Sequence, residues 1–260
     1  MLQDMASVAA RFSARDTLDG RIDEAFALMQ AMGFDGLIYD YTPSTAGLDG
    51  RIGIPTLLKL RNVAGDMHDY WCDREYFRID PVQRLATQTS VPFFWSYDPG
   101  VETRISRLLT DETKPVCDFL HAHDMLSGVT VPVHRPQGDY ATVTGVRYGA
   151  RRDFMAEALH RLAEFGLLAQ IFHEAADELF DEPVRNGSGV RLTKRERECL
   201  RYSSHGLSAK EVSRIIDRSV PTVVMHLNSA ARKLGAKNRT EAVARAAHYH
   251  LLDEPPSYKS

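Results

Sequence analysis

The segment Leu192-Thr-Lys-Arg-Glu-Arg-Glu-Cys-Leu200 begins the most strongly patterned part of this 260-residue chain. That part extends from residue 192 to residue 252. Thr193 is followed three residues later by Glu196. At this spacing a capping side chain and its reciprocal partner satisfy backbone N–H groups at a helix start. Ser208 and Glu211 repeat the spacing. The pattern predicts one helix that begins after Thr193 and a second that begins after Ser208.

The rest of the stretch indicates two further helices. Ser219 precedes Pro221, and proline is tolerated in a first helical turn because its missing N–H would have no partner there. Asn238 resembles another capping residue, while Gly206 and Gly235 stand where helices should stop. Apolar residues recur at helical spacing throughout. We therefore predict four short helices joined by tight turns, which is a helix-turn-helix arrangement.

Charge separates this stretch from the rest of the chain. Residues 191–245 contain 13 Lys and Arg against 5 Asp and Glu, a net charge of +8, although the whole chain has a net charge of −3. A basic helical module on an acidic chain is typical of a protein that binds duplex DNA. On charge and helix pattern alone, the alternative is an ordinary helical bundle with a basic, solvated surface.

Four strings make the DNA-binding interpretation specific: Lys210-Glu211-Val212, Thr222-Val223-x-x-His226, Lys233-Leu234-Gly235 and Asn238-Arg239-Thr240-Glu241-Ala242. With the opening segment, they resemble the LuxR-type DNA-binding domain. The resemblance implies a recognition helix from about Val220 to Lys233 that lies in the major groove of double-stranded DNA. Basic residues at its ends would contact phosphates, and polar residues on its exposed face would read base edges. The residues implied to touch DNA are Arg218, Thr222, His226, Asn228, Lys237, Asn238 and Arg239.

One departure from that family lies inside the recognition helix. Many relatives carry a basic or polar residue just after the Thr-Val pair, whereas Val224 and Met225 follow it here. These two apolar residues would contact a thymine methyl group or a second copy of the chain instead.

Length and composition predict two domains and a linker. A chain of 260 residues with 43% apolar and 26% charged residues suits two modest globular domains. We expect a ligand-binding and dimerisation domain over 1–180, a polar linker over 181–190, the DNA-binding domain over 191–252 and a tail over 253–260. No apolar run is long enough to cross a membrane and no signal peptide is evident, so we expect a cytoplasmic protein. The three cysteines are too sparse to suggest a disulfide framework.

Periodicity and turn signals predict an α/β fold for the first domain. After a loose start over residues 1–16, the pattern indicates helices at 18–32, 66–79 and 153–180, and one or two helices over 101–123 interrupted near Pro115. Strands are indicated at 34–41, 56–63 and 91–95, with a hairpin formed by 128–133 and 140–148. This order predicts an α-β-α sandwich, which can enclose a ligand pocket, followed by the all-α helix-turn-helix domain.

The first domain also carries recognisable strings. Asp80-Pro81-Val82, Pro92-Phe93-Phe94-Trp95 and Gly128-Val-Thr-Val-Pro132 resemble the autoinducer-binding domain of LuxR-type quorum-sensing regulators. The resemblance implies that Asp80 accepts a hydrogen bond from an amide N–H of the ligand and that Trp95 walls the pocket. The candidate ligand-binding residues are Met67, Trp71, Tyr76, Asp80, Val82, Trp95 and Thr144.

Two of these positions depart from the usual lactone sensors. Where those proteins have a Trp that donates to the lactone carbonyl, this chain has Met67, which cannot donate. Where they have a Tyr that donates to the acyl carbonyl, it has Trp71. Loss of a polar partner costs about 1–3 kcal/mol, so we expect little response to acyl-homoserine lactones. The Met-Trp pair resembles LuxR solos of plant-associated bacteria, which respond to small plant compounds.

Other interpretations remain open on the residues alone. The aromatic residues around Trp71 could form a plain core, and Asp80 could be a cap or turn residue before Pro81. The first domain could sense an acyl-homoserine lactone, or it could bind a protein rather than a small molecule. No catalytic, metal or cofactor motif is evident, so we expect a regulator without enzymatic activity. We expect it to act as a homodimer, joined partly through 153–180, on a palindromic promoter site.

Overall fold

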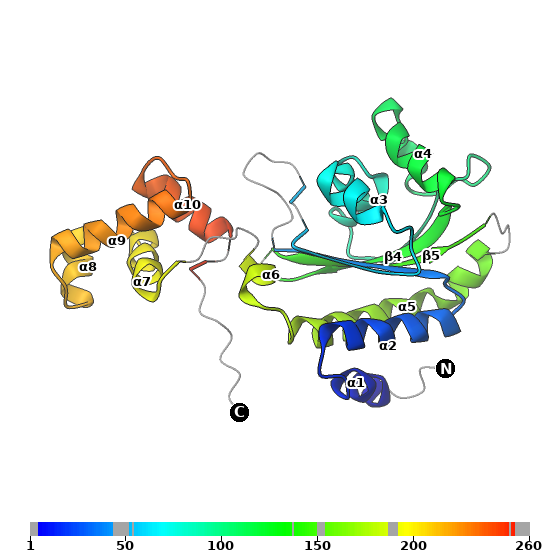
Figure 1. The fold of residues 1–260 in the computed structure, drawn as a ribbon, viewed down its shortest axis with the longest axis horizontal. Helices are drawn as coiled ribbons and strands as arrows, with labels where there is room; N and C mark the ends of the chain where they lie inside the picture. Colours follow the sequence, from blue (N-terminus) through cyan, green and yellow to red (C-terminus); the bar gives the residue numbers. More distant parts are fainter. Residues whose placement is uncertain are drawn as a thin grey trace. The chain divides into compact units, whose positions relative to one another are not determined.

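The computed structural model describes residues 5–43, 52–53, 55–136, 138–149, 154–186, 192–249 and 251–252 (Figure 1). The chain divides into two units, Met1–Arg185 and Asn186–Ser260. The first contains a sheet covered by helices and the second is helical, which confirms the predicted fold class. None of the helices described is long and apolar enough to cross a membrane.

A five-stranded antiparallel sheet organises the first unit. Its order is β2-β1-β5-β4-β3, and its strands are β1 (Gly36–Thr42), β2 (Leu57–Arg61), β3 (Phe93–Ser96), β4 (Ser127–His134) and β5 (Tyr140–Arg147). Successive side chains of a strand point to opposite faces, so Leu37, Tyr39 and Tyr41 pack into one core and Ile38 packs into the other. Gly138, at φ +92°, lies in the turn between β4 and β5, where the hairpin was predicted.

Helices cover both faces of this sheet. On one face lie α1 (Met5–Ser13), α2 (Leu18–Ala31) and α5 (Phe154–Asp177), and on the other lie α3 (Pro81–Ala86) and α4 (Lys114–Ala122) (Figure 1). The first core joins α1, α2 and α5 to the sheet, with Phe12 and Phe172 packed at a ring-centroid distance of 5.6 Å. The second core lies under α3 and α4 and includes Trp71 and Trp95. The candidate ligand site is in this second core.

Three local predictions were wrong. The loose start predicted over 1–16 was wrong for the described part of that range, because α1 is a helix whose Val8 and Phe12 are buried in the first core. Residues 66–79 do not form one helix: a single π-helical turn, Asp69–Asp73, is followed by a 3₁₀ turn, Tyr76–Arg78, with a left-handed residue between them at Glu75. Pro115 does not interrupt a helix but lies in the first turn of α4, where it leaves no intrahelical hydrogen bond unmade.

The predicted linker is helical in its first part. Helix α6 (Glu182–Asn186) follows α5, and Arg185 donates to the Asp177 carboxylate at 2.9 Å. The Thr56 hydroxyl donates to the Val184 carbonyl at 2.6 Å. These contacts tie α6 to the ligand domain. The rest of the predicted linker, 187–190, and the predicted tail, 253–260, lie outside the described residues.

The second unit contains the four predicted helices. They are α7 (Lys194–Ser204), α8 (Ala209–Ile215), α9 (Val220–Lys233) and α10 (Arg239–His248). The side chains of Thr193, Ser208, Ser219 and Asn238 each accept a hydrogen bond from the backbone N–H three residues later, so all four predicted caps are confirmed. Apolar side chains from all four helices form one core.

Candidate ligand cavity and DNA-contacting surface

A small cavity of about 20 Å³ lies in the second core of the ligand domain. Six of the seven predicted ligand residues line it, namely Met67, Trp71, Asp80, Val82, Trp95 and Thr144. Ile38, Gln83, Tyr97, Leu120 and Met125 complete its wall. This volume holds about one water molecule, so a larger ligand must widen the cavity.

Asp80 is a helix cap and also lines the cavity. It precedes Pro81 as the N-cap of α3, where its carboxylate accepts the Val82 N–H at 2.9 Å. The same oxygen accepts the Tyr97 hydroxyl. Burial, opposed by these hydrogen bonds, raises the pKa of Asp80 to about 6. The carboxylate is therefore a buried acceptor in the wall of the cavity.

Trp71 provides a donor in the same wall. It lies in the π-helical turn Asp69–Asp73, and such turns occur frequently at functional sites. Its indole Nε1 is buried and has no hydrogen-bond partner among the described residues. Met67, also buried in this wall, adds no donor. A ligand with a carbonyl oxygen would satisfy the unpaired N–H of Trp71.

Trp95 and Thr144 belong to a hydrogen-bonded chain across the sheet. The Trp95 Nε1 donates to Thr130 Oγ1 at 2.9 Å, and the Thr130 and Thr144 hydroxyls lie 2.8 Å apart. Trp95 pairs with Gly128, where a Cβ atom would lie 2.5 Å from the Trp95 ring and 2.4 Å from the Gly145 carbonyl oxygen. Only glycine at position 128 leaves room for the Trp95 ring in this place.

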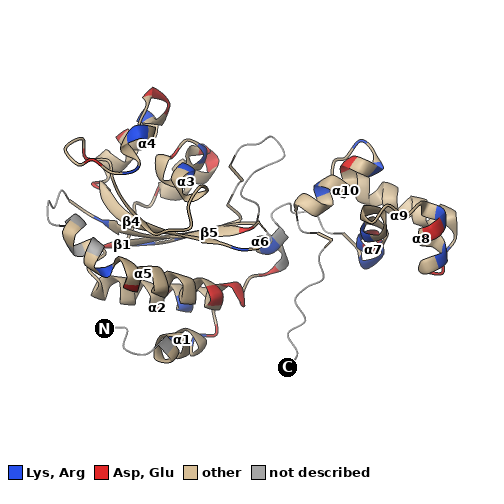
Figure 2. Cartoon of the chain, turned by 180° about the vertical axis from the view of Figure 1, so that it is seen from behind, with Lys and Arg blue, Asp and Glu red and all other residues tan. Residues whose placement is uncertain are grey.

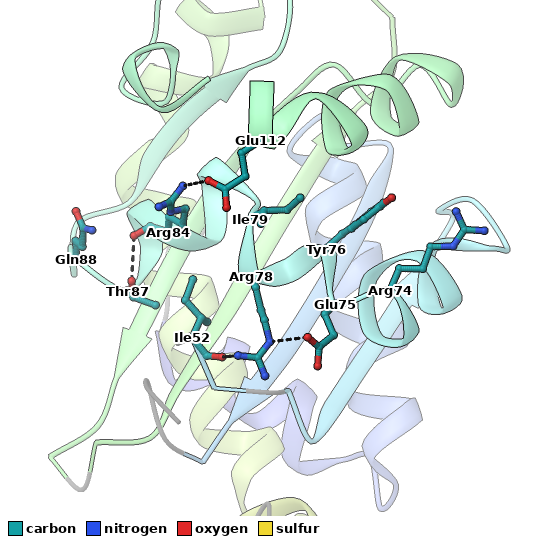
Figure 3. Close-up of a pocket in the computed structure, with 10 residues that line it drawn as sticks. All are labelled: Ile52, Arg74, Glu75, Tyr76, Arg78, Ile79, Arg84, Thr87, Gln88 and Glu112. Atoms are coloured by element: carbon teal, nitrogen blue, oxygen red, sulfur yellow. Dashed lines mark hydrogen bonds and ion pairs between the residues drawn. The ribbon is translucent and has the colours of Figure 1, made fainter. Parts of the chain in front are cut away.

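Tyr76 lies outside the cavity, unlike the other predicted ligand residues. Its ring packs against Tyr70 at a centroid distance of 4.6 Å. It lines a separate pocket of about 590 Å³ (Figure 3). In that pocket Arg78 pairs with Glu75 at 3.1 Å and Arg84 with Glu112 at 3.6 Å, so charged side chains already pair across it. Tyr76, which the 3₁₀ turn Tyr76–Arg78 carries, is thus the one predicted ligand residue that is absent from the cavity lining.

Two polar residues of the cavity were missed at the level of sequence. Tyr97 follows Trp95 by two residues, and period-two alternation would have placed both side chains on one side of the chain. Gln83 lies in the first turn of α3, just after Asp80, and is buried. Glutamine is usually exposed, so the sequence did not indicate that Gln83 would line the cavity.

In the second unit, α9 has the bounds predicted for the recognition helix. Val223, Leu227 and Ala230 are buried, whereas Asn228, Val224 and Met225 are exposed. Thr222 and His226 are partly buried, and the Thr222 hydroxyl lies 2.8 Å from that of Ser219. Val224 and Met225 are 40% and 57% exposed, so the outer face of this helix is partly apolar. Figure 2 shows Lys and Arg on the neighbouring helices α7, α8 and α10.

The remaining DNA candidates differ in how free their side chains are. Arg218 and Lys237 are exposed, and Arg218 donates only to the adjacent Asp217 carbonyl at 2.7 Å among the described contacts. Asn238 is engaged as the cap of α10. Arg239 is partly buried and donates to the Leu207 carbonyl, so it joins α10 to the turn before α8. Its position indicates a structural role beside any phosphate contact.

Glu196 fixes α7 against the recognition helix. Its carboxylate accepts the Lys233 ammonium at 2.7 Å, the Ser229 hydroxyl at 2.7 Å and the Thr193 N–H at 2.7 Å. Burial acts to raise the pKa of Glu196, but the hydrogen bonds from Lys233, Thr193 and Ser229 prevail and lower it to about 2. The C-terminal part of α9 is therefore held against α7 by a partly buried, charged hydrogen-bond network.

Comparison with known proteins matches both units. The autoinducer binding domain family matches residues 17–176, and the luxR family of bacterial regulatory proteins matches 190–246. The transcriptional activator BjaR1 of Bradyrhizobium diazoefficiens is 32% identical and aligns with 96% of this chain and 100% of its own. RpaR of Rhodopseudomonas palustris, a quorum sensing-dependent transcriptional regulator, is 30% identical over 80% of each chain.

A solved structure shares the overall fold. The crystal structure of Escherichia coli SdiA matches 96% of this chain and 98% of its own with a TM-score of 0.68 and 21% identity. The family matches confirm the resemblance noted from the sequence, with a ligand-responsive domain followed by a DNA-binding one. This chain belongs to the LuxR family of DNA-binding transcriptional regulators that carry an autoinducer-binding domain.

Proposed function

We propose that this regulator senses a small plant-derived or other non-lactone molecule that presents a carbonyl oxygen and an N–H group, as an amide does. The observation that carries the proposal is the unpaired indole N–H of Trp71 in a cavity also lined by the Asp80 carboxylate. A buried donor without a partner costs about 1–3 kcal/mol, which a ligand carbonyl would recover. Asp80 would accept the ligand N–H.

Met67 supports a ligand other than a lactone. It is buried in the cavity wall, where the usual lactone sensors place a Trp that donates to the lactone carbonyl. A thioether cannot make that hydrogen bond. In the same fold, a structure of SdiA holds octanoyl-rac-glycerol, which is not a lactone.

An acyl-homoserine-lactone receptor is the second candidate. It is favoured by similarity to RpaR, which is described as quorum sensing-dependent. A lactone would then bind with one hydrogen bond fewer, because Met67 offers no donor. A first domain that binds a protein instead of a small molecule would leave the Trp71 N–H unexplained.

We further propose that the response is read out by a cytoplasmic dimer on DNA. Helix α5 would contribute to the dimer contact, and two recognition helices would lie in successive major grooves of a palindromic site. Val224 and Met225 suit van der Waals contact with thymine methyl groups. Activation of transcription is the expected output, since BjaR1 and several other relatives are described as activators.

The test is a thermal-shift screen of the full-length protein with acyl-homoserine lactones in one set and small amides with fractionated plant extract in the other. A ligand that binds only the folded state raises the unfolding midpoint by mass action. We expect stabilisation by the second set alone. Stabilisation by lactones would favour the second candidate.

Two variants connect the response to the cavity. Asp80→Asn and Trp71→Phe should each weaken the stabilising compound by about tenfold, because each removes one hydrogen bond to a buried polar group. Tyr76→Phe is the matched control, since Tyr76 lies outside the cavity. Equal stabilisation of the wild type and the two cavity variants would remove this cavity as the sensor.

A further inference from the structure

Asp40 is an acidic residue in the interior of the ligand domain. It lies in the middle of β1, a strand flanked on both sides by other strands, and it is 0% exposed. Its neighbours Tyr39 and Tyr41 pack into the first core, so its own side chain lies on the other face, with Ile38. Carboxylates are rarely buried without a paired cation, so this position requires a specific reason.

The hydrogen bonds of Asp40 satisfy only one of its two oxygens. Oδ2 accepts the Gln83 Nε2 at 2.9 Å and the Thr142 hydroxyl. Oδ1 is buried and has no partner among the described residues. Each carboxylate oxygen can accept two hydrogen bonds, and a buried carboxylate oxygen that accepts none destabilises the folded state. The fold alone does not explain why an acid is kept there.

The register of the sheet places Asp40 one same-face residue pair beyond the lining of the cavity. Ile38 and Thr144 are paired across β1 and β5, and both line the cavity. Asp40 and Thr142 are the next pair on the same face, about 7 Å further along the strands. Gln83 links the two places, because it lines the cavity and donates to Asp40. A cavity widened along the sheet by one such pair would reach Asp40.

The charges of this region favour a ligand that brings a donor. Asp40 and Asp80 are both buried, and among the described residues neither carboxylate forms an ion pair with Lys or Arg. Burial is the main reason that the pKa of Asp40 rises to about 6, with a further contribution from the charge of Asp80. An N–H or O–H group at Oδ1 would stabilise the ionised form.

We propose that Asp40 is a second anchor for the signal molecule, and that it accepts an amine or hydroxyl group from the end of the ligand remote from Asp80. The ligand is then polar at both ends and does not end in an alkyl chain. This inference rests on the proposed sensing function of the same cavity and specifies its ligand class. Thr142, Thr144 and Thr130 line the same face of the sheet and suit a polar ligand.

Three matched series of primary alkanamides test the inference with full-length protein. Members of each length end in an amine, a hydroxyl or a methyl group, and binding is measured by calorimetry and thermal shift. We expect the amine- or hydroxyl-ended members to bind. The methyl-ended members should bind at least about tenfold more weakly. Comparison of the first two series distinguishes a charged from a neutral donor. The isosteric variant Asp40→Asn should lose the preference.

A second readout needs no ligand. Removal of a buried, unpaired charge should raise the unfolding midpoint of the ligand-free Asp40→Asn variant, whereas a purely structural carboxylate would lower it when replaced. Asp139→Asn is the matched control, because Asp139 is also buried but accepts the Tyr41 hydroxyl on the opposite face of the sheet. It should leave ligand preference unchanged.

The outcomes separate this inference from the proposed function. The second anchor would be rejected, and the sensor kept, if the wild type bound methyl-ended and donor-ended members equally and if this binding were weakened in Asp80→Asn but unchanged in Asp40→Asn. A lower midpoint for ligand-free Asp40→Asn would also overturn the anchor. Binding that is as tight in Asp80→Asn as in the wild type would reject the cavity itself. Failure of every series to bind the wild type would contradict both proposals.

Discussion

Gly128 shows how one missing side chain positions the cavity wall. A Cβ atom there would lie 2.4 Å from the Gly145 carbonyl oxygen and 2.5 Å from the Trp95 ring. We expect Gly128→Ala to destabilise the ligand domain by about 1–3 kcal/mol, since the core must shift to accept the methyl group. Urea unfolding followed by tryptophan fluorescence measures this loss. Gly65→Ala, where no atom lies within 4 Å of the added Cβ, is the control.

Asp40 and Asp80 predict how stability depends on pH without ligand. Burial raises the pKa of each to about 6, above the ordinary value near 4. A raised pKa means that the folded state binds the proton more tightly than the unfolded state does. The contribution of this proton to the free energy of unfolding is therefore complete below pH 4 and is lost as the pH rises through 6. Between pH 5 and 7.5 each group should remove roughly 1 kcal/mol from the free energy of unfolding.

Urea titrations at the two pH values measure that change. Asp40→Asn and Asp80→Asn should each flatten the profile, because amides do not titrate in this range. The groups facing Asp40 include Asp80 and the thiol of Cys72, whose pKa burial raises to about 11, so Cys72 remains neutral throughout. An unchanged pH profile in both variants would mean that these carboxylates are not the groups that titrate.

At the scale of helices, Arg218 and Arg239 separate DNA contact from support of the fold. Arg218 is exposed before α9, whereas Arg239 joins α10 to the Leu207 carbonyl. We expect Arg218→Ala to weaken DNA binding and to lower its salt slope by about one, with no change in unfolding midpoint. Arg239→Ala should weaken DNA binding and also lower the midpoint of the DNA-binding domain, because the Leu207 carbonyl loses its donor.

Fluorescence anisotropy across a salt series, paired with calorimetry, makes this comparison. The DNA is a site selected from random duplexes by the protein. A normal midpoint for Arg239→Ala would assign Arg239 to phosphate contact alone. An unchanged salt slope for Arg218→Ala would remove Arg218 from the interface.

At the scale of the whole molecule, α5 is the proposed dimer contact. Its inner face is buried against the sheet by Phe165, Leu168 and Phe172, while Leu167 remains 43% exposed on the outer face. We expect Leu167→Glu to shift the protein from dimer to monomer in sedimentation velocity, because a charge would be buried at the contact. Glu174→Lys, on the same outer face, controls for a simple change in charge. A dimer that survives Leu167→Glu would place the contact elsewhere.

Much of the DNA-binding unit could be predicted because its signals are local. Thr193, Ser208 and Ser219 cap helices through residues three positions away, and such contacts form whatever the rest of the chain does. The start of α9 after Ser219 was predicted for the same reason, and its extent to about Lys233 was implied by the resemblance to the LuxR-type DNA-binding domain. In the ligand domain, the strands were predicted from β-rich runs between turn signals, and the helices were predicted from apolar residues at helical spacing.

Contacts between residues that are distant in the sequence could not be predicted and are known only from the tertiary structure. Asp40, Gln83 and Thr142 form one network only because β1, α3 and β5 are brought together, and no local pattern encodes that pairing. The same holds for the hydrogen bond from Tyr97 to Asp80 and for the hydrogen bond from Arg239 to the Leu207 carbonyl. Spacing along the chain identified which side chains could bind a ligand or DNA. Burial and sheet register, which depend on the assembled core, decided which of them line the cavity and which support the fold.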